Sequence, residues 1–247
     1  MSKQPELPLD YPASQGTSRY GAPVPEFVEA AGKFAKKYGR NYNPSQFENI
    51  KAGEGHNALY PVVRESIGKP MTKRMERSYS ALRNEIPAHY NHLTSPVEQG
   101  GLGISVEFTK ENPYSHPSEI AKDVTENRRL KVLSTESTGS HSLFSNEEND
   151  MFRAVHDAFG HLATARDFSK HGEEAAYASH AQMFSKKALP ALASETRAQN
   201  SYVLNAGDFP PNAPVDIPNW ATKVNGVPPK KKAPKQKKPE QLKFKGM

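Results

Sequence analysis

The stretch SNEENDMFRAVHDAFGHL, residues 145–162, decides how the middle of this chain folds. It predicts a helix, because Ser145 and Glu148 have the spacing of a capping box and apolar residues then recur at three- and four-residue steps. The apolar positions cover most of the girth of this helix: Met151, Phe152, Val155, Ala158, Phe159 and Leu162. A helix of this kind is expected to be buried.

A line of polar residues runs along the same helix. Asn149, Arg153, His156 and Asp157 follow one another at short helical steps. Ionisable groups on a buried helix need partners, a metal ion or a water-filled pocket. We therefore interpret this line as part of a site, with Asp157 orienting His156 or acting as an acid or base, and with Arg153 pairing with Asp157.

The two histidines of this stretch are candidate metal ligands. His156 and His161 are five residues apart, which on an ideal α-helix separates their side chains by about 140°. They can converge only if the helix ends or deforms between them. Gly160 precedes His161 and can adopt a left-handed or otherwise irregular backbone, so the predicted metal site depends on it. The alternative is that each histidine is a satisfied core or capping residue.

Two downstream segments carry further polar side chains. The first, HGEEAAYASHAQMFSKK, predicts a helix from Gly172 to about Lys187, and a second helix is expected after Pro190. Glu173, Tyr177 and His180 share one face of the first helix. The second helix presents a polar group within SETRAQNS: Glu195, Arg197, Gln199 and Asn200. Such density suits the wall of a site, although a solvated helix surface with a charged start would look similar.

The rest of the chain predicts a mainly α fold with a small β-sheet (α+β). Helices are expected over Glu26–Tyr38 and from Pro70 to Ile86, where Pro87 makes continuation costly. Residues 101–108 and 129–134 have strand patterns, with a short helix over 118–127 between them. The segment KAGEGHNALYP, which contains His56, is interpreted as a surface loop.

These patterns divide the chain into four parts. We expect an extended Pro-rich arm over 1–25, a single helical domain with the site over 26–205, and a Pro-rich segment over 206–222. Phe209, Ile217 and Trp220 are the possible anchors of that segment on the surface of the domain. Residues 223–247 are expected to be a disordered Lys-rich tail, since they offer almost no apolar surface to bury.

Composition limits the classes of function. The 247 residues include no cysteine, which excludes disulfides, thiolate metal sites and cysteine nucleophiles. Residues 1–16 lack a basic start followed by an apolar run, and no stretch approaches the length of a membrane span. The sequence therefore predicts a soluble protein that is not exported and has no membrane partner.

Positive charge is concentrated in the tail. Residues 223–247 contain nine Lys and one Glu, a net charge of +8, so the remaining residues carry 6 − 8 = −2. Such an arm can bind nucleic acid by releasing counterions, and the alternative is a solubilising tail without a dedicated partner. The lysines expected to contact nucleic acid are Lys230, Lys231, Lys232, Lys235, Lys237 and Lys238.

The motif HDAFGH, residues 156–161, resembles the iron-binding helix of the aromatic amino acid hydroxylases. This resemblance implies a non-haem Fe(II) ion bound by His156, His161 and a downstream glutamate, for which Glu195 is the best positional match. Zn²⁺ and Mn²⁺ are the alternative metals, because imidazole and carboxylate ligands suit them as well.

A broader resemblance covers about Gly101 to Asn205. The ordered segments ENDMFRAVHDAFGH, GEEAAYASHAQMFS and ETRAQNS are similar to those of an uncharacterised protein family from tailed bacteriophages, which also occur in large multidomain phage proteins. The resemblance implies the cytoplasm of an infected bacterium, or the virion, as the setting. Nucleic acid and other phage proteins are the partners it implies.

Three functional hypotheses follow. The first is an Fe(II) oxygenase or hydroxylase that acts on a nucleotide base or DNA, in which His180 or Glu173 is an alternative ligand or general base. Its substrate would be positioned by Arg153, Tyr177, Arg197, Gln199 and Asn200. The second is a Zn²⁺- or Mn²⁺-dependent hydrolase with the same ligands. The third is a non-enzymatic, DNA-associated virion or packaging protein whose polar line is a buried network that fixes the core.

Overall fold

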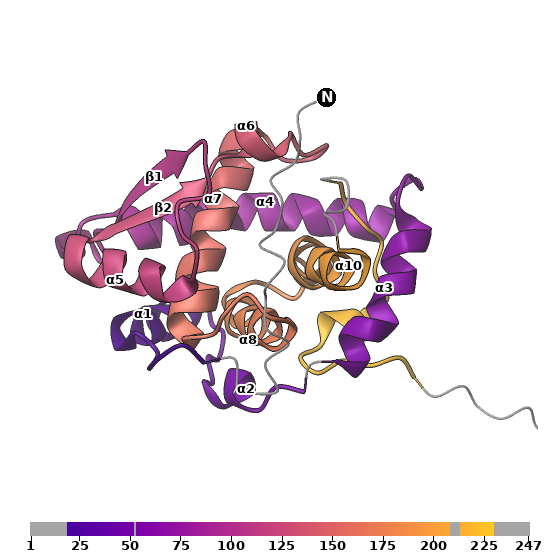
Figure 1. Cartoon of the computed structure of the whole chain (residues 1–247), viewed down its shortest axis with the longest axis horizontal. Helices are drawn as coiled ribbons and strands as arrows, with labels where there is room; N and C mark the ends of the chain where they lie inside the picture. The colour runs from indigo at the N-terminus through magenta and orange to yellow at the C-terminus, as the bar shows by residue number, and fades with distance from the viewer. Residues whose placement is uncertain (1–18, 52, 208–212, 230–247) are drawn as a thin grey trace, which may run out of the picture.

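The computed structural model describes residues 19–51, 53–207 and 213–229, and it confirms a mainly α-helical fold with one small sheet (Figure 1). The α-helices and strands are α1 (Pro25–Lys37), α2 (Ser45–Glu48), α3 (Glu54–Ser66), α4 (Lys73–Thr94), β1 (Ser105–Thr109), α5 (Pro117–Asn127), β2 (Arg129–Leu133), α6 (Thr135–Thr138), α7 (Asn146–His156), α8 (Lys170–His180), α9 (Leu189–Ala193) and α10 (Gln199–Ala206). Two π-helical turns, η2 (Asp157–Leu162) and η4 (Ser194–Ala198), continue α7 and α9. Three 3-10 turns complete the fold: η1 (Val97–Gln99), η3 (Ala181–Met183) and η5 (Asn219–Thr222).

Helix α7 begins where the capping box predicts. The Ser145 hydroxyl accepts a hydrogen bond from the Glu148 amide at 3.1 Å, and the Glu148 carboxylate accepts one from the Ser145 amide at 2.8 Å. The helix then lies between two apolar clusters. Val155 belongs to the cluster that includes α1 and the sheet, and Phe152 to the cluster built mainly by α3, α4 and α9. Burial on both sides, at about 1.5–3 kcal/mol for each large side chain, holds this helix at the centre of the fold.

The small sheet has the predicted order of strand, helix and strand. Strands β1 and β2 pair in parallel, with Ser105 opposite Arg129, and α5 forms the crossover between them (Figure 1). Leu130 and Val132 of β2 are buried in the core, whereas Phe108 of β1 is 41% exposed. The sheet therefore packs mainly through β2, next to α7.

Helix α4 does not end at Pro87, contrary to the prediction. It runs to Thr94 with Pro87 inside it. Pro87 itself lies on the exposed side, and the buried stripe of the helix continues beyond it through His89 and Leu93. Burial of these side chains offsets the hydrogen bond that proline removes. Tertiary packing thus overrides the local signal.

The prediction of a surface loop around His56 is also wrong. Residues 54–66 form α3, and the His56 side chain is only 1% exposed. Its Nδ1 lies 3.6 Å from the carboxylate of Glu174 on α8. Burial and the nearby charge of Arg197 lower the pKa of His56 to about 3, so its imidazole is neutral. A buried partner on a distant helix is the reason that this histidine lies inside the protein.

The predicted helix after Gly172 is shorter than expected. Helix α8 ends at His180 and is followed by the turn η3, after which Phe184 is extended and buried. In Figure 1, α8 and α10 are seen end-on between α7 and α3. Helix α8 packs against both π turns, η2 and η4, so it lies at the centre of the candidate site.

The Pro-rich segment after α10 is anchored partly as predicted. Ile217 is 1% exposed and joins the cluster of α3 and α4, and Trp220 is half-buried against the same cluster. Phe209, the third predicted anchor, lies outside the described residues. The turn η5 interrupts the extended path, and its backbone is held by buried side chains of α8 and η4.

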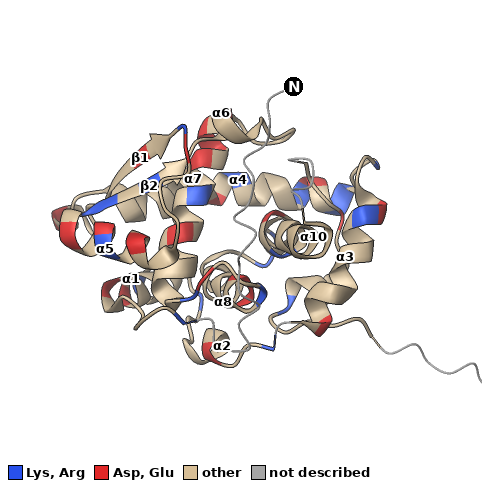
Figure 2. Ribbon diagram, in the orientation of Figure 1, with Lys and Arg blue, Asp and Glu red and all other residues tan. Residues whose placement is uncertain are grey.

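Charged residues of both signs are mixed over the outer elements (Figure 2). Within the described residues, no helix combines the length and apolar character that crossing a membrane requires.

Candidate metal centre

The helix deforms between His156 and His161, as the sequence predicts. Residues 157–162 form the π turn η2, in which hydrogen bonds join residues five apart. Two residues five positions apart therefore lie on the same side of the helix. The imidazole rings of His156 and His161 are 5.1 Å apart and perpendicular. The π turn thus provides the convergence that an ideal α-helix would prevent.

Neighbouring hydroxyl groups satisfy the carbonyls of this π turn. Ser179 of α8 donates to the Phe159 carbonyl at 2.6 Å, and Thr164 donates to the Gly160 carbonyl at 2.7 Å. The Tyr20 hydroxyl donates to the His161 carbonyl at 3.2 Å. These bonds compensate for the distorted ladder and stabilise the unusual turn.

Gly160 has a different role from the one expected. Its backbone is not left-handed. Instead, a Cβ atom at this position would lie 3.1 Å from the Ala176 Cβ and 3.3 Å from the His156 Nδ1. The absence of a side chain therefore lets α8 and the His156 ring approach the π turn closely.

Glu173 completes a group of three possible metal ligands. One ligand atom from each of His156, His161 and Glu173 lies within 4.8 Å of the other two. The Nε2 atoms of His156 and His161 each lie 3.5 Å from a different oxygen of the Glu173 carboxylate. Metal bonds of about 2.1 Å would place neighbouring ligand atoms about 3 Å apart, so a small adjustment of these side chains would fit one ion.

The Nδ1 atoms of both imidazoles have partners on the side away from Glu173. His161 Nδ1 lies 3.0 Å from the Arg166 carbonyl, which can only accept, so this nitrogen carries the proton. His156 Nδ1 lies 3.4 Å from His180 Nδ1. When His156 donates in that contact, Nε2 is in both rings the atom that would give its lone pair to a metal ion, and without an ion a proton on His161 Nε2 can take that place.

Electrostatics also favour an ionised carboxylate at the centre of the group. Burial raises the pKa of Glu173, but the facing His161 and His156 outweigh burial and lower it to about 2. Burial lowers the pKa of His161, and the charges of Glu173 and Asp157 overcome this effect and raise it. Burial holds the pKa of His180 well below its usual value, so His180 is neutral.

A pocket of about 570 Å³ opens beside the three side chains, and His156 and Glu173 line it. The predicted polar line of α7 and η2 forms one wall, through Asn149, Arg153, His156 and Asp157. Residues of η4 and α10 contribute another wall: Glu195, Thr196, Gln199, Asn200, Val203 and Leu204. The site therefore has room for a ligand next to the possible metal position.

Glu195, expected as the third ligand, is not part of this group of three. It lines the same pocket, but its carboxylate accepts hydrogen bonds from the Tyr79 hydroxyl and from Gln199 Nε2, the latter at 2.8 Å. It also lies 3.3 Å from His141 Nε2. The contacts with α4 and with the segment before α7 hold Glu195 away from the two histidines, and Glu173 takes the place predicted for it.

Two other predicted site residues have structural contacts instead. Arg197 is 1% exposed and donates to the Glu174 carboxylate at 2.6 Å and to the carbonyls of Ala221 and Lys223. Tyr177 is fully buried, and its hydroxyl donates to the Thr222 carbonyl at 2.8 Å. Both side chains face the C-terminal segment and do not line the pocket.

The expected roles of Arg153 and Asp157 also change. Arg153 donates to the Leu133 carbonyl at 3.0 Å and to the Thr138 hydroxyl at 2.7 Å. In the described part of the chain, Asp157 has no ion pair with Arg153 and no hydrogen bond to His156. His180, and not Asp157, is therefore the residue that contacts the outer nitrogen of His156.

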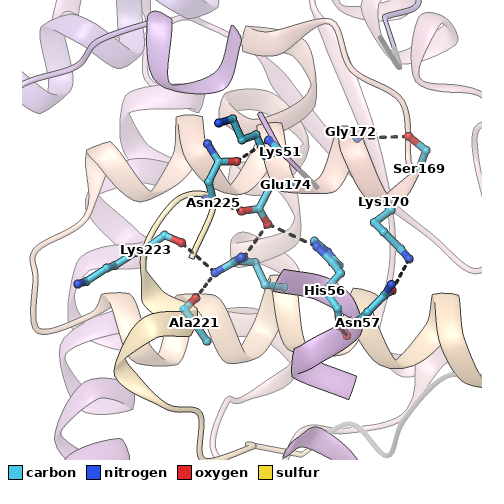
Figure 3. A network of polar contacts seen from close by, with 12 residues as sticks. Lys51, His56, Asn57, Ser169, Lys170, Gly172, Glu174, Ala221, Lys223 and Asn225 are labelled. Carbon is cyan, nitrogen blue, oxygen red and sulfur yellow. Dashed lines mark hydrogen bonds and ion pairs between the residues drawn. The ribbon is translucent and has the colours of Figure 1, made fainter. Parts of the chain in front are cut away.

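Sequence reasoning missed Glu174, which follows Glu173 directly. Glu174 is 1% exposed and joins Arg197, His56 and the backbone amide of Asn225 in one network (Figure 3). Two consecutive glutamates at the start of a helix are explained by their favourable interaction with the helix dipole, so nothing in the sequence indicated that Glu174 is buried. The six tail lysines predicted to contact nucleic acid lie outside the described residues.

Comparisons of the chain with protein-family models, with curated proteins and with solved structures found no match.

Proposed function

We propose that this protein is a mononuclear metalloenzyme whose metal ion is held by His156, His161 and Glu173. The observation that carries the proposal is the direction of the two imidazoles. Each turns its Nε2 toward the same carboxylate, at 3.5 Å, while its Nδ1 is engaged by a neighbour. Outer partners of this kind are typical of metal-binding histidines, whose tautomer and orientation they fix.

Fe(II) is the metal that we propose. Two histidines and one carboxylate that leave the remaining positions open are the ligand set of non-haem Fe(II) oxygenases. Bound there, Fe(II) would supply the oxygen chemistry of a hydroxylation or oxidation. The pocket beside His156 and Glu173 would hold the substrate next to the metal.

The walls of the pocket support a flat, polar substrate, and we propose a nucleotide base, free or in a strand. Gln199 and Asn200 bring amide groups, which can donate and accept hydrogen bonds at the edge of a base. Phe152 and Phe168 bring aromatic surface to the same pocket. The protein's own part would be to orient the base and to exclude water around the reacting atom.

Hydrolysis with Zn²⁺ or Mn²⁺ is the second candidate, and Asp157 favours it. This half-buried carboxylate lines the pocket next to His156 and has no hydrogen bond or ion pair among the described residues. Burial raises the pKa of Asp157. A carboxylate that is free to accept a proton is what a general base for the attack of water requires.

Metal titration of the purified full-length protein tests the proposal. Metal-stripped protein would be titrated with Fe(II), without oxygen, and with Mn²⁺ and Zn²⁺, and the variants Glu173→Gln and Glu195→Gln would be compared. Both variants remove one negative charge from the same pocket. We expect one ion per wild-type chain, a loss of at least 100-fold in affinity for Glu173→Gln, and unchanged affinity for Glu195→Gln.

The third hypothesis, a non-enzymatic buried network, predicts the opposite result. A folded wild type that binds no metal under replete conditions would leave Glu173 as an ion-pair partner of two histidines and would refute the proposal. The reaction class is tested by mass spectrometry of nucleosides from cells that express the wild type or Glu173→Gln. A nucleoside that gains an oxygen atom in the wild type alone indicates oxygenation, whereas products of bond cleavage by water indicate hydrolysis.

A further inference from the structure

A second hollow, distinct from the metal pocket, lies between α4, the start of α9 with the two lysines that precede it, and η5. Its volume is about 870 Å³. Helix α4 supplies one wall. A second wall consists of Lys186, Lys187, Leu189 and Pro190, and a third of Asn219, Thr222 and Lys223. None of its lining residues belongs to the candidate metal centre. We refer to this hollow as the basic groove.

The side chains of the basic groove carry charge of one sign. Five of its lining residues are basic, and none is acidic: Arg74, Arg77, Lys186, Lys187 and Lys223. Arg74 is paired with Asp216 at 3.3 Å. The other four are exposed and have no acidic partner among the described residues. Elsewhere positive and negative residues are mixed over the ribbon (Figure 2), so the groove differs from the rest of the molecule in having basic residues alone.

The walls of the groove are fixed by buried contacts. The Ser78 hydroxyl of α4 accepts a hydrogen bond from the Ala191 amide of α9 at 2.8 Å. Arg197 donates to the carbonyls of Ala221 and Lys223, and Glu174 holds its guanidinium in place (Figure 3). The positive side chains therefore extend from a rigid frame, which lowers the entropy cost of binding an anion.

The sequence beyond the groove indicates an elongated anion. Lys223 forms part of the third wall, and residues 230–245 add eight more lysines. A small anion would need only the groove, whereas a polyanion can use both the groove and the lysines that follow it in the sequence. The groove is concave and of modest volume, so it suits one flexible strand better than the wide, convex surface of a duplex.

We propose that the basic groove binds single-stranded nucleic acid through its phosphates. Arg77, Lys186, Lys187 and Lys223 would neutralise successive phosphate groups, and Ser80 and Asn84 on the α4 wall would add hydrogen bonds. Because the contacts are to the backbone, the groove would bind DNA and RNA strands alike and show little preference for sequence. This inference does not depend on the metal centre.

Fluorescence anisotropy with labelled (dT)20 and (rU)20 tests this inference on the full-length protein. The groove variant is Lys186→Gln with Lys187→Gln. The matched control is Lys36→Gln with Lys37→Gln, an adjacent exposed pair on α1, which contributes nothing to the groove. Both variants lose the same charge and keep the tail. We expect the groove variant alone to bind on the order of tenfold more weakly at 0.1 M salt, and its salt slope to fall by about 1.4, or about 0.7 for each lost phosphate contact.

Several results would overturn the inference. Equal weakening by both variants would indicate general charge attraction, and an unaffected groove variant would assign any binding to other residues. Tighter binding of a duplex of equal length, with the same loss of affinity in the groove variant, would identify a duplex and not a single strand as the ligand of the groove. Displacement of (dT)20 by polyglutamate at equal charge would indicate an acidic protein partner. Metal stoichiometry of the groove variant, which should be that of the wild type, keeps this test separate from that of the metal centre.

Discussion

His156 and His180 face each other through their Nδ1 atoms, 3.4 Å apart. His180 is fully buried on α8, two turns after Glu173, which faces the opposite nitrogen of His156 at 3.5 Å. One helix thus contacts both nitrogens of the same imidazole. The position of α8 therefore determines how His156 is presented to a metal ion.

Replacing His180 should weaken metal binding without removing a ligand. His180→Leu takes away the acceptor behind His156, and we expect the metal affinity to fall about 10- to 100-fold, as is typical for outer partners of metal ligands. His180→Asn keeps an oxygen acceptor and should recover most of the affinity. Competition with a chromophoric chelator measures both values, and equal affinities for the two variants would contradict an orienting role.

Gly160→Ala should disturb the site although alanine favours helices. The added Cβ would lie 3.1 Å from Ala176 and 3.3 Å from His156 Nδ1, so α8 or the imidazole must shift. We expect a loss of about 1–3 kcal/mol in stability, together with weaker metal binding. The control is Gly32→Ala in α1, where the nearest atom would be 3.9 Å away. That variant should be stabilised by about 1 kcal/mol in urea unfolding, and identical shifts for the two variants would refute the argument.

Arg197→Met should destabilise the protein although Arg197 is not one of the three possible metal ligands. It would leave the buried carboxylate of Glu174 without its guanidinium partner and remove the donor to the Ala221 and Lys223 carbonyls. Loss of one partner of a buried pair costs about 3–5 kcal/mol. The double variant Glu174→Met with Arg197→Met should recover part of this loss. Unchanged stability of Arg197→Met together with altered substrate affinity would instead indicate that Arg197 contacts the substrate.

His89 should make the protein less stable in acid. Burial, with a smaller effect of the nearby Arg40 charge and of His92, lowers the pKa of His89 to about 3. The unfolded chain, with a pKa near 6.5, binds the proton first, so the stability contributed by the neutral His89 is full above pH 6.5 and falls as the pH drops toward 3. Between pH 7 and pH 5 the loss is about 2 kcal/mol.

His89→Phe should remove this pH dependence, because phenylalanine does not bind a proton. Its ring would still pack against Phe34 and Phe184, so the fold should be kept. Urea unfolding of both proteins at the two pH values provides the measurement. The stability of the variant relative to wild type should rise by about 2 kcal/mol on acidification, and parallel curves would show that His89 is not the cause.

Local signals in the sequence predicted much of the fold. The capping box at Ser145, the alternation before Phe108 and the helical stripe after Pro70 each involve neighbours in the chain, and each element is found. The deformation between His156 and His161 was predictable only on the hypothesis that both histidines bind one ion, because residues five apart on an α-helix lie about 140° from each other. What failed depends on distant contacts. Pro87 is tolerated and His56 is buried because of residues far away in the sequence.

The choice of the third possible ligand also depends on contacts between residues that are distant in the sequence. Glu173 and Glu174 are adjacent, and helical spacing alone does not tell which one faces the histidines. The rotation of α8 settles this, and it is fixed by Arg197 and the C-terminal segment on the side of Glu174. Glu195 was favoured by its position in a motif, but Tyr79 and His141, on other elements, hold its carboxylate.

The π turn of residues 157–162 has a genetic consequence. It accommodates one more residue than the α-helical path between the same end points would need. Loss of a single codon between His156 and His161 would allow a regular helix and leave the two histidines four residues apart, about 40° from each other on the same face, while the capped start and most of the apolar packing would survive. Two gene sequences that differ by one codon can therefore keep the same pair of histidines facing each other, one on a π turn with a spacing of five and the other on a regular helix with a spacing of four.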